Sequence, residues 1–492
     1  ARPASYAAPA ARRPNFVFVF DDQLRACDLG FNGGPNVATP RIDRLASEGV
    51  AFTNAISSCP LCAPYRGMLM TGRYPTHTGI VANFVECNPR EYGLANAFHD
   101  AGYDTGFIGK WHLAAGQMKR SGKFRVRESE DREARQRARE AYLRENPEPD
   151  FVPPGPRRLG FDFWAAYNIH AEYKAAYYYR DTPQRLVMPR YETDSEVDMA
   201  IEYMKAREDS DRPFLLMVAP QPPHPPWREA DLPEGYLARI PEQLTRRRNV
   251  EPGEPRTPRD PRCYYAMIAN VDDAIGRLVD YLDASRHGDH TIVVLTSDHG
   301  EMLGSHGLWD KMLPFAESLD VPLILRCPRR LPAGRRSDAL YTPMDHMPTL
   351  CGLAGITAPA SAEGIDLTPA VLGGRARERD VALIMSYVSD GGTWFNSGTD
   401  WPEWRGLRSK TRTYCKWLGG REALYENRRD PYQLRNLAKD PQHQTELEAM
   451  RRRLGKELAI AHDEFLPGTA YADWYDNERN LVRTAFGPVV RQ

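Results

Sequence analysis

Carboxylate and imidazole side chains follow two of the most apolar segments of this chain, at the points where those segments end. One apolar run ends at Asp21 and Asp22, and a second ends at Asp298 and His299. Such runs are typical of buried parallel strands, and open α/β sheets bind their ligands at the carboxyl ends of the strands. Carboxylate oxygens suit a hard divalent cation such as Ca²⁺, whereas imidazole is more usual on transition metals. We therefore expect these four side chains to bind a divalent cation.

Basic side chains follow two further predicted strands. Residues 105–110 end at Lys110, with His112 two positions on, and residues 213–219 run into a proline-rich loop that carries His224. Each feature alone has an ordinary explanation, because acids after a strand often form turns and a Lys-x-His sequence is usually a surface feature. Four such strand ends in one chain favour a single shared site.

The eight cysteines of the chain are too few and too scattered for a disulfide scaffold. Cys59 and Cys62 lie close together and fit the pattern Cys-x-x-Cys. A lone pair of this kind, without a second Cys or His pair nearby, is a weak indication of zinc binding or of redox chemistry. The residues that follow Cys62 favour another role.

Composition and charge argue against several classes of protein. Hydrophobic residues make up 41% of the 492 residues and charged residues 27%, which is ordinary for a globular protein. The 65 Lys and Arg residues nearly balance the 66 Asp and Glu residues, so no overall field favours nucleic acid or a membrane surface. No apolar run reaches the length of about 18 residues that a transmembrane helix needs. We expect neither nucleic acid nor a membrane as a partner.

Alternating predicted strands and helices indicate an α/β fold with a large, mostly parallel central sheet flanked by helices. We divide the chain into a flexible N-terminal tail at 1–13, a catalytic domain at 14–375 and a smaller α+β domain with an antiparallel sheet at 376–492. The tail is compatible with the remnant of a signal peptide, a cloning remnant or a natural extension. The charged segment 118–150 has almost no apolar stripe and is predicted to be an exposed helix or an insertion.

Two segments carry a resemblance to a known family. The first, at 60–72, reads PLCAPYRGMLMTG and resembles the Cys-x-Pro-x-Arg motif of sulfatases with its downstream Thr-Gly. The second, at 102–112, reads GYDTGFIGKWH and resembles the second sulfatase motif. Both motifs occur in the family's order, between the two acidic strand ends, and the resemblance runs from about 14 to 326. The chain is thus similar to the formylglycine-dependent type I sulfatases of the alkaline-phosphatase-like superfamily.

The resemblance implies an alkaline-phosphatase-like fold and calcium-dependent hydrolysis of sulfate esters. In that family a formylglycine-generating enzyme oxidises the motif cysteine, here Cys62, to formylglycine. The hydrated aldehyde carries two hydroxyls: one attacks sulfur and the alcohol leaves, and the second is then deprotonated and expels sulfate. The resemblance implies that the cation is bound by residue 62 together with Asp21, Asp22, Asp298 and His299.

The same resemblance implies roles for the basic residues. Arg66 and Lys110 hold the formylglycine oxygens, and His112 is the base that triggers release of sulfate. His224 and Lys311 contact the sulfate, and one of them protonates the leaving oxygen. The implied catalytic residues are Cys62, Arg66, Lys110, His112, His224 and Lys311.

Two features depart from the usual sulfatase pattern. His299 stands where many sulfatases have Asn, and an Asp-His pair also occurs in phosphonate monoester hydrolases of the same fold, which favour Mn²⁺ over Ca²⁺. In that variant Gln23 is a candidate for a further ligand. Tyr65 is bulkier than the small residue common at its place in the motif. The enzyme alternative is therefore a phosphonate or phosphate diester hydrolase, and the non-enzyme alternative is a binding protein on a degenerate scaffold, which should lack an expected residue.

An aromatic segment bears on the substrate. Residues 160–183 are rich in Tyr and include His170 and Tyr177, and aromatic faces beside basic groups suit sugar rings that carry anionic groups. The alternative is that these tyrosines pack between core and surface. Together with His306 they are the candidate substrate-binding residues for a sulfated carbohydrate, with residues 401–410 as a candidate pocket cover; a small aryl sulfate is the alternative substrate. Because sulfatases of this type are often exported in bacteria and Ca²⁺ is plentiful outside cells, we expect a periplasmic or secreted protein.

Overall fold

The computed structural model describes residues 12–116, 141, 144–251, 260–388, 402–476 and 479–489. Most of the predicted N-terminal tail, 1–11, lies outside the described residues. So do 118–140, 142 and 143 of the predicted charged segment 118–150, and Trp401 of the predicted pocket cover.

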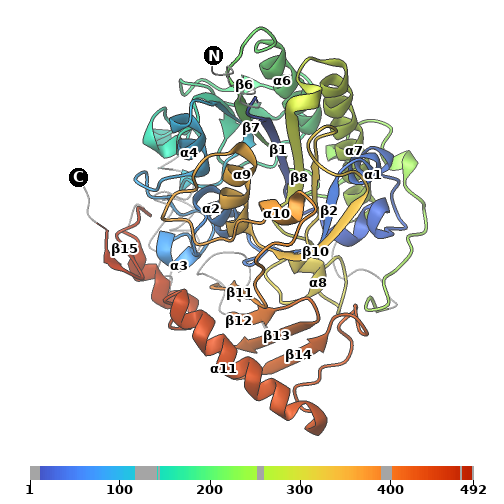
Figure 1. The fold of residues 1–492 in the computed structure, drawn as a ribbon, viewed down its shortest axis with the longest axis vertical. Helices are drawn as coiled ribbons and strands as arrows, with labels where there is room; N and C mark the ends of the chain where they lie inside the picture. Colours follow the sequence, from blue (N-terminus) through green and yellow to red (C-terminus); the bar gives the residue numbers. More distant parts are fainter. Residues whose placement is uncertain are drawn as a thin grey trace, which may run out of the picture.

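A central sheet of eight strands forms the body of the protein (Figure 1), in the order β10-β2-β9-β8-β1-β7-β3-β4. Its neighbours pair in parallel except at β9, which runs antiparallel to both β2 and β8. The predicted mostly parallel sheet is therefore confirmed. The strands are β1 (Asn15–Asp21), β2 (Val50–Ala55), β3 (Asp104–Lys110), β4 (Phe163–Tyr167), β7 (Phe214–Ala219), β8 (Thr291–Ser297), β9 (Leu323–Arg326) and β10 (Arg335–Tyr341).

Helices cover both faces of this sheet, which explains why its strands read as continuous apolar runs rather than alternating ones. Successive side chains of a strand point to opposite faces. In β1, Phe16 and Phe18 belong to one buried cluster, and Val17 and Val19 belong to another. The first cluster includes α2 (Cys62–Thr71), α4 (Leu94–Asp100) and α9 (His346–Ala354). The second includes α1 (Pro40–Ser47), α6 (Glu192–Lys205) and α7 (Pro261–Ala284).

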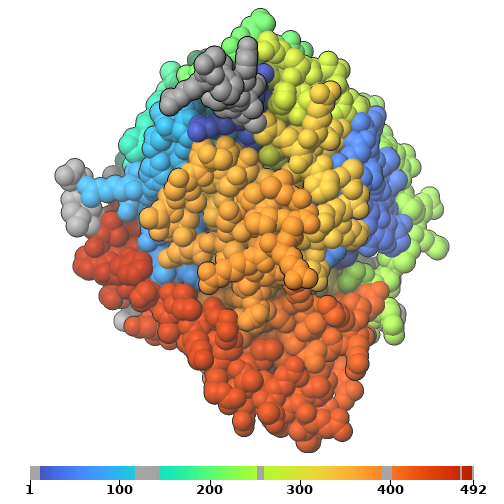
Figure 2. Space-filling model, in the orientation of Figure 1, coloured from blue at the N-terminus to red at the C-terminus, as the bar shows by residue number. Residues whose placement is uncertain are grey.

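A second sheet of four antiparallel strands follows in the C-terminal region. Its strands are β11 (Ala382–Ser386), β12 (Trp404–Arg408), β13 (Arg412–Trp417) and β14 (Glu422–Glu426). The long helix α11 (Gln444–Ile460) lies alongside it (Figure 1), with Leu447 and Leu454 in the same buried cluster as Leu407 and Leu424. This part of the chain forms one end of the molecule (Figure 2). The antiparallel sheet confirms the predicted α+β character of this region, whereas the boundary at residue 375 stays a prediction.

Short elements complete the described structure. They are α3 (Pro75–Thr78), α8 (Ala316–Leu319), α10 (Thr368–Val371), and the strand pairs β5 (Tyr177–Tyr178) with β6 (Leu186–Val187) and β15 (Arg483–Thr484) with β16 (Gly487–Pro488). Within the described ranges, no helix is both long and apolar enough to cross a membrane.

Candidate active site

The carboxyl ends of the central strands bring the predicted side chains to one edge of the sheet. β1 lies between β8 and β7, and both pair with it in parallel, so all three strands end at the same edge. Asp21 is the last residue of β1 and lies opposite Ser297, the last residue of β8. Asp22 and Asp298 therefore leave the two strands side by side. The amide of Asp298 donates to the carbonyl oxygen of Asp21 over 3.0 Å, which locks the two strand ends together.

The helix that begins at Cys62 delivers two further side chains to this edge. Leu61, just before α2, is extended, and the helix ends at Gly72, which adopts the left-handed conformation with φ of 68°. Cys62 is thus in the first turn, and Arg66 follows four residues later, on the same face of the helix. The positive end of the helix dipole favours negative charge at residue 62.

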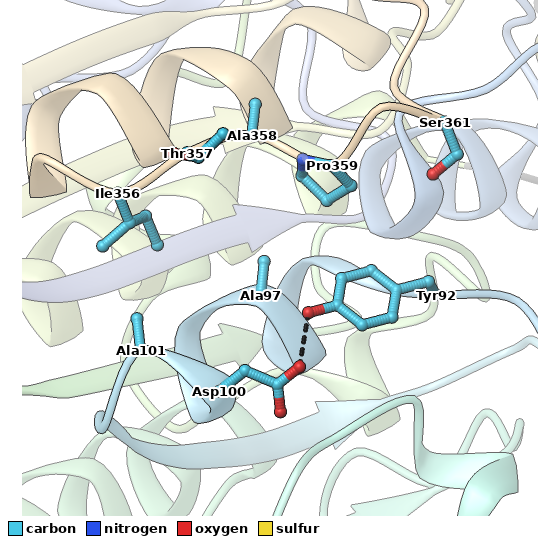
Figure 3. A pocket seen from close by; sticks show the side chains of 9 residues that line it. All are labelled: Tyr92, Ala97, Asp100, Ala101, Ile356, Thr357, Ala358, Pro359 and Ser361. Carbon is cyan, nitrogen blue, oxygen red and sulfur yellow. Dashed lines mark hydrogen bonds between the residues drawn. The ribbon is translucent and has the colours of Figure 1, made fainter.

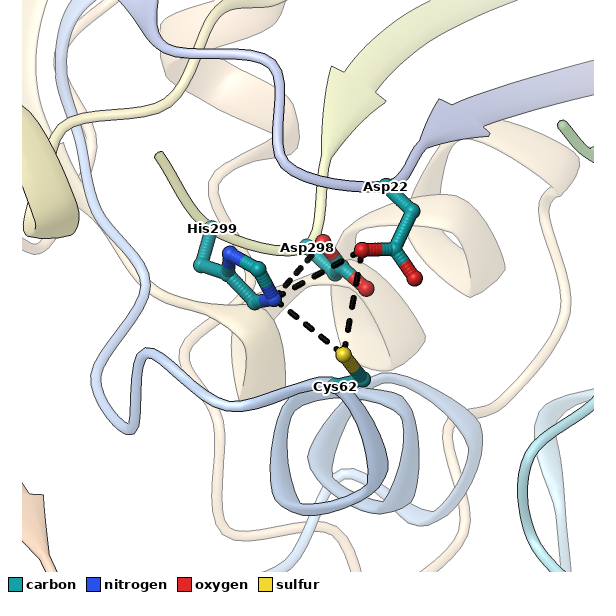
Figure 4. Close-up of side chains that lie close together, drawn as sticks. All are labelled: Asp22, Cys62, Asp298 and His299. Atoms are coloured by element: carbon teal, nitrogen blue, oxygen red, sulfur yellow. Dashed lines mark hydrogen bonds and ion pairs between the residues drawn. The ribbon is translucent and has the colours of Figure 1, made fainter. Parts of the chain in front are cut away.

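Four of the predicted side chains converge on one small volume (Figure 4). One ligand atom from each of Asp22, Cys62, Asp298 and His299 lies within 4.8 Å of the other three. Cys62 Sγ is 3.3 Å from His299 Nε2 and 3.7 Å from Asp22 Oδ1. His299 Nε2 is 3.5 Å from Asp298 Oδ1. All four side chains are buried, so water does not screen their charges.

The ring of His299 is oriented as a ligand. Its Nδ1 lies 3.0 Å from the carbonyl oxygen of Gly300, and a carbonyl can only accept, so Nδ1 carries the hydrogen. Nε2 then presents its lone pair to the cluster, as metal-binding histidines do. Burial lowers the pKa of His299, which favours the neutral ring.

Asp21, the fifth predicted ligand, is not among the four side chains whose ligand atoms converge, but it lies close enough to Asp298 and Asp22 to be affected by their charges. Its side chain is fully buried, and within the described part of the chain neither carboxylate oxygen has a hydrogen-bond partner. Burial, and then the charges of Asp298 and Asp22, raise its pKa well above the usual value. A buried carboxylate without a partner is costly, and a bound cation supplies the missing counter-charge. The residues present therefore fit a divalent ion.

Two buried cations pair with the carboxylates of the cluster. Lys110 Nζ lies 2.5 Å from Asp22 Oδ2, and Arg66 Nη2 lies 3.2 Å from both Asp22 Oδ2 and Asp298 Oδ2. Lys311 adds a third positive charge at the same site. A divalent ion would add two more, which makes a suitable environment for an anionic ester.

Three more of the predicted basic residues surround the cluster. Both ring nitrogens of His112 are buried and lack a partner within the described residues, and its pKa is well below the usual value because of burial and the nearby charges of Lys110 and Arg66. Burial and the charge of Lys311 likewise lower the pKa of His224, and His224 Nδ1 lies 2.7 Å from the carbonyl oxygen of Pro225. Both rings are thus neutral and able to accept a proton.

Lys311 remains charged at the same site. Burial lowers the pKa of its ammonium, but Cys62 and Asp22 more than offset that effect, so the pKa lies above the usual value. Its Nζ donates to Gln23 Oε1 over 2.6 Å. The site therefore combines buried carboxylates, two neutral imidazoles and the charged ammonium of Lys311.

Comparison with known proteins identifies the family. The Sulfatase family model matches residues 14–356, and the model described as N-sulphoglucosamine sulphohydrolase, C-terminal, matches residues 304–459. An ulvan-active sulfatase from Formosa agariphila is 33% identical over 470 residues, covering 94% of this chain and 84% of that protein. The chain belongs to the sulfatase family.

Solved structures agree with this assignment. A structure from Bacteroides fragilis described as a sulfatase is 29% identical, covers 95% of this chain and 100% of its own, and superposes with a TM-score of 0.77. A phosphonate monoester hydrolase from Silicibacter pomeroyi, 20% identical with 92% and 96% coverage and a TM-score of 0.68, shares the fold. The predicted alkaline-phosphatase-like fold is therefore confirmed, as is the predicted class of enzyme: the protein is a sulfuric ester hydrolase.

The sulfatase holds its three candidate substrate-binding residues in internal contacts. His306 stacks on Phe315 with ring centroids 4.2 Å apart, and its amide donates to the carbonyl oxygen of Asn249. His170 stacks on Tyr167 at 3.7 Å, and its Nε2 lies 3.0 Å from the carbonyl oxygen of Tyr177.

Tyr177 itself is 8% exposed, and the guanidinium of Arg185 lies over its ring at 4.0 Å. These contacts correspond to the packing alternative for the aromatic segment, and substrate contacts by these residues stay predictions.

Sequence reasoning missed the partners that hold the catalytic candidates in place. Tyr173, inside the aromatic segment, donates its hydroxyl to the carbonyl oxygens of His224, at 2.5 Å, and Pro225, at 2.9 Å. The amide oxygen of Gln23, the candidate for a further ligand, accepts from Lys311 over 2.6 Å, and its role as a ligand stays a prediction. Glu301, three residues after Asp298, was not singled out, although a buried acid so close to the cluster was a signal.

A separate surface cavity of about 490 Å³ lies between α4 and residues 356–361 (Figure 3). Its lining is mostly small and apolar. The carboxylate of Asp100 in this lining already accepts from the hydroxyl of Tyr92 over 2.6 Å. The cavity therefore offers none of the chemistry gathered at the sheet edge.

Proposed function

We propose that this sulfatase hydrolyses a sulfate ester to an alcohol and inorganic sulfate through a formylglycine at position 62 and one divalent cation. The observation that carries the proposal is the position of the motif cysteine: Cys62 Sγ lies in a buried cluster with two carboxylates and an imidazole. No structural role of the thiol explains this position, whereas the precursor of a nucleophile must lie at the reaction centre.

The cation is held by Asp21, Asp22, residue 62, Asp298 and His299. Three of the five side chains are carboxylates, which favours Ca²⁺ over Mn²⁺, although the imidazole keeps Mn²⁺ as the second candidate. When bound, the ion neutralises the acidic cluster and stabilises negative charge on the attacking oxygen and on the sulfate.

Maturation is a two-electron oxidation of Cys62 by a formylglycine-generating enzyme: molecular oxygen takes up four electrons, two from the side chain and two from an external thiol, and the sulfur leaves as hydrogen sulfide. The thiol sulfur and two hydrogens leave the side chain and one oxygen enters. Formylglycine supplies, in its hydrated form, an oxygen nucleophile for sulfur and a second hydroxyl whose proton is removed when sulfate is released.

The chain's own residues then position the ester and move protons. Arg66 and Lys110 place positive charge beside residue 62, where negative charge develops. His112, buried and neutral, accepts the proton that must leave residue 62 for sulfate to depart. His224 and Lys311 contact the sulfate from the other side, and one of them protonates the leaving alcohol oxygen.

The substrate we propose is a sulfated carbohydrate. The support comes from the names of two independent matches, an ulvan-active sulfatase along nearly the whole chain and an N-sulphoglucosamine sulphohydrolase model over the C-terminal part. A small aryl sulfate should also be cleaved, because its alcohol is a good leaving group. We further propose export to the periplasm or medium, where Ca²⁺ is plentiful, and a functional division near residue 375 between the catalytic region and the C-terminal sheet.

The second candidate function is hydrolysis of a phosphonate or phosphate diester. His299 in place of Asn favours it, and a phosphonate monoester hydrolase shares the fold. Both kinds of ester carry one negative charge, so the charge of the site does not distinguish them. A binding protein on a degenerate scaffold would lack a metal or catalytic residue, and none of the residues implied by the family is missing.

Peptide mass spectrometry and a paired assay test the proposal. Trypsin releases residues 45–66, a peptide that contains both Cys59 and Cys62. We expect fragment ions that place a loss of about 18 Da at residue 62, with Cys59 unchanged as the internal control. Hydrolysis of 4-nitrophenyl sulfate should exceed that of 4-nitrophenyl phenylphosphonate. The reverse order would favour the second candidate, and an unmodified Cys62 in a host able to mature it, with neither ester cleaved, would refute the mechanism.

A further inference from the structure

A loop at residues 79–87 contacts both the start of α2 and the segment that carries His112. The side-chain oxygen of Asn83 accepts from the amide of Ala63, in the first turn of α2, over 2.9 Å. The ring of Phe84 packs edge-to-face against the ring of His112, with centroids 5.3 Å apart. The loop thus reaches the nucleophile position on one side and the proposed base on the other.

The ring of His112 depends on packing for its position. Within the described residues neither of its ring nitrogens has a hydrogen-bond partner, so no hydrogen bond fixes its orientation. The amide of Cys87 donates to the carbonyl oxygen of Leu113, the residue after His112, over 2.9 Å. The loop is therefore tied to the backbone beside His112, and Phe84 supplies part of the packing that holds the ring.

Phe84 itself has a backbone conformation that an aromatic residue rarely adopts. Its φ is 60°, and such a conformation persists only where surrounding contacts enforce it. One such contact comes from the C-terminal part of the chain, where Arg479 Nη1 donates to the carbonyl oxygen of Phe84 over 3.3 Å. The amide of Glu86 donates to the carbonyl oxygen of Arg479 over 3.4 Å. Arg479 therefore holds the loop through both its side chain and its backbone.

The guanidinium of Arg479 is buried at this position. The residue is 1% exposed, and burial lowers its pKa to about 10, so the side chain is still charged at neutral pH. A buried charge is unfavourable unless hydrogen bonds compensate for its lost hydration. The hydrogen bond to Phe84 gives a reason for a charged side chain at this place.

Contacts on both sides of Arg479 anchor it to the catalytic region. The hydroxyl of Tyr475 donates to the carbonyl oxygen of Gly79, at the start of the loop. The amide of Ala485 donates to the carbonyl oxygen of Thr76 over 3.0 Å, and β15 lies beside α3 (Figure 1). This part of the chain is therefore fixed to the segment that leads into the loop.

We propose that Arg479 and Phe84 are positioning residues, which hold the ring of His112 in place for the release of sulfate. This inference rests on the proposed function, in which His112 accepts the proton that must leave residue 62 for sulfate to depart. The C-terminal part of the chain thus takes part in turnover through Phe84 and without a contact to the reacting atoms.

Steady-state kinetics of Arg479→Ala and Phe84→Ala with 4-nitrophenyl sulfate test the proposal. The alcohol leaves before His112 acts, so kcat/KM, which reports the steps up to that departure, should stay near its starting value. Because an aryl sulfate has a good leaving group, the later release of sulfate should limit kcat. We expect kcat to fall about 10- to 100-fold and KM to fall with it. General damage to the fold would instead lower kcat and kcat/KM together at an unchanged KM.

Further variants separate positioning from loss of a buried arginine. Arg479→Lys keeps one donor for the carbonyl oxygen of Phe84 and should recover part of the lost kcat. The double variant should be no slower than Phe84→Ala alone, because Arg479 then has no ring to hold. Arg158→Ala is the matched control, since Arg158 is also buried and donates to backbone carbonyl oxygens, those of Val152 and Arg180. It should lower stability and leave kcat unchanged.

Hydrogen exchange supplies a readout that needs no turnover. In Cys62→Ala protein, which holds no formylglycine, peptides that span residues 79–87 should exchange faster when Arg479→Ala is added. Peptides from β1 should exchange as before, and Arg158→Ala should leave the exchange of 79–87 unchanged. The exchange result thus reports on the loop alone.

The contrary outcomes are distinct. Unchanged exchange at 79–87 in Arg479→Ala, or an unchanged kcat, would overturn the positioning role. A fall in kcat/KM equal to the fall in kcat would show that the damage reaches the nucleophile or the whole fold, and would overturn it too. If the unaltered protein, with formylglycine verified at residue 62, cleaved no sulfate ester, the proposed function would fail and the role in sulfate release with it, whatever the exchange result.

Discussion

Two buried charged clusters in this protein differ in whether their charges are satisfied. One is the metal centre at the edge of the central sheet, and the other joins Arg405 of β12 to Asp463, just after α11. The side chains of Arg405 and Asp463 are 0% exposed, as are those of Asp22 and Arg66 in the metal centre. Burial alone therefore does not separate a structural cluster from a functional one.

The cluster in the C-terminal region is complete. Arg405 makes a two-pronged contact with Asp463 and donates to the carbonyl oxygen of Ser386 over 2.7 Å. The hydroxyl of Tyr471 donates to Asp463 Oδ1 over 3.2 Å, and the amide of Phe465 donates to the same oxygen over 2.8 Å. One positive and one negative charge cancel, and the carboxylate has partners on both oxygens. Such a pair holds chain segments together and has no capacity to bind anything else.

The metal centre is the opposite case. Arg66 and Lys110 contact Asp22 and Asp298, but both oxygens of the neighbouring Asp21 lack a partner within the described residues. In the proposed function a divalent cation completes this arrangement, because it supplies the counter-charge that the buried carboxylates lack. A buried carboxylate that lacks a partner therefore indicates function, whereas the burial of a charged cluster alone does not.

The largest effect should come from the nucleophile. Cys62→Ala removes the precursor of formylglycine without disturbing the charged groups, so we expect sulfatase kcat to fall about 10⁴-fold or more. Alanine suits the first turn of α2, and the thermal unfolding temperature should stay within a few degrees of that of the unaltered protein. Steady-state assays with an aryl sulfate and a thermal melt measure both. Residual activity near the starting level would rule out residue 62 as the nucleophile.

A substitution in the cluster of Arg405 and Asp463 should lower the free energy of unfolding. Asp463→Asn leaves the buried guanidinium of Arg405 without a counter-charge, so the free energy of unfolding should fall by about 3–5 kcal/mol. The kcat of the folded fraction should be unchanged. Denaturant unfolding measures the first quantity. Asp209→Asn is the control, because the pair of Asp209 with Arg286 lies on the surface and should contribute less than about 1 kcal/mol.

A substitution in the cluster at the sheet edge should instead weaken the binding of a divalent ion. At a Ca²⁺ concentration about 100 times the Kd, the bound ion should stabilise the unaltered protein by about 2.7 kcal/mol, and a chelator should remove that amount. Asp21→Asn should lose most of this gain, yet its ion-free form should be no less stable than the ion-free starting protein, because the raised pKa of Asp21 already favours a neutral carboxyl there and an amide is neutral too. Parallel melts with Ca²⁺ and with chelator measure both. A large loss of stability in ion-free Asp21→Asn would mean that Asp21 has a structural partner.

His346 is a buried, uncharged group outside both clusters, and its replacement should have the smallest effect on stability. Burial lowers the pKa of His346 to about 3, and its ring lies 5.0 Å from that of Phe18. A histidine with a lowered folded pKa takes up its proton on unfolding, so its contribution is present above the unfolded pKa of about 6.5 and is lost as pH falls toward 3.

Between pH 7 and pH 5 this one group should reduce the free energy of unfolding by about 2 kcal/mol. In His346→Phe the pH dependence of stability should be flatter by that amount over the same interval. An identical pH dependence in the variant and the unaltered protein would show that His346 does not account for it.

The sequence allowed the strand ends to be predicted because buried parallel strands read as continuous apolar runs, and Asp21, Lys110 and Asp298 stand where such runs stop. The first turn of α2 at Cys62 was predictable from the motif and from Pro64. The pairing of Gln23 with Lys311 was not, since it joins side chains 288 residues apart and depends on a loop whose positive φ values no local pattern indicates.

The aromatic segment shows a second limit. A run of tyrosines predicts aromatic contacts but not their partners. Tyr173 donates to the backbone of the loop that carries His224, and the guanidinium of Arg185 lies over the ring of Tyr177. Both tyrosines thus have packing partners that composition does not indicate, and a substrate contact by Tyr177 stays a prediction.

The most direct test of the account is the number of divalent ions bound per chain. Protein equilibrated with Ca²⁺ and freed of excess ion should contain one Ca²⁺ per chain by elemental mass spectrometry, both in the unaltered protein and in Asp463→Asn, and close to none in Asp21→Asn. Equal ion content in the unaltered protein and Asp21→Asn, or none in either, would contradict the claim that the acidic cluster beside Cys62 is the metal centre of this sulfatase.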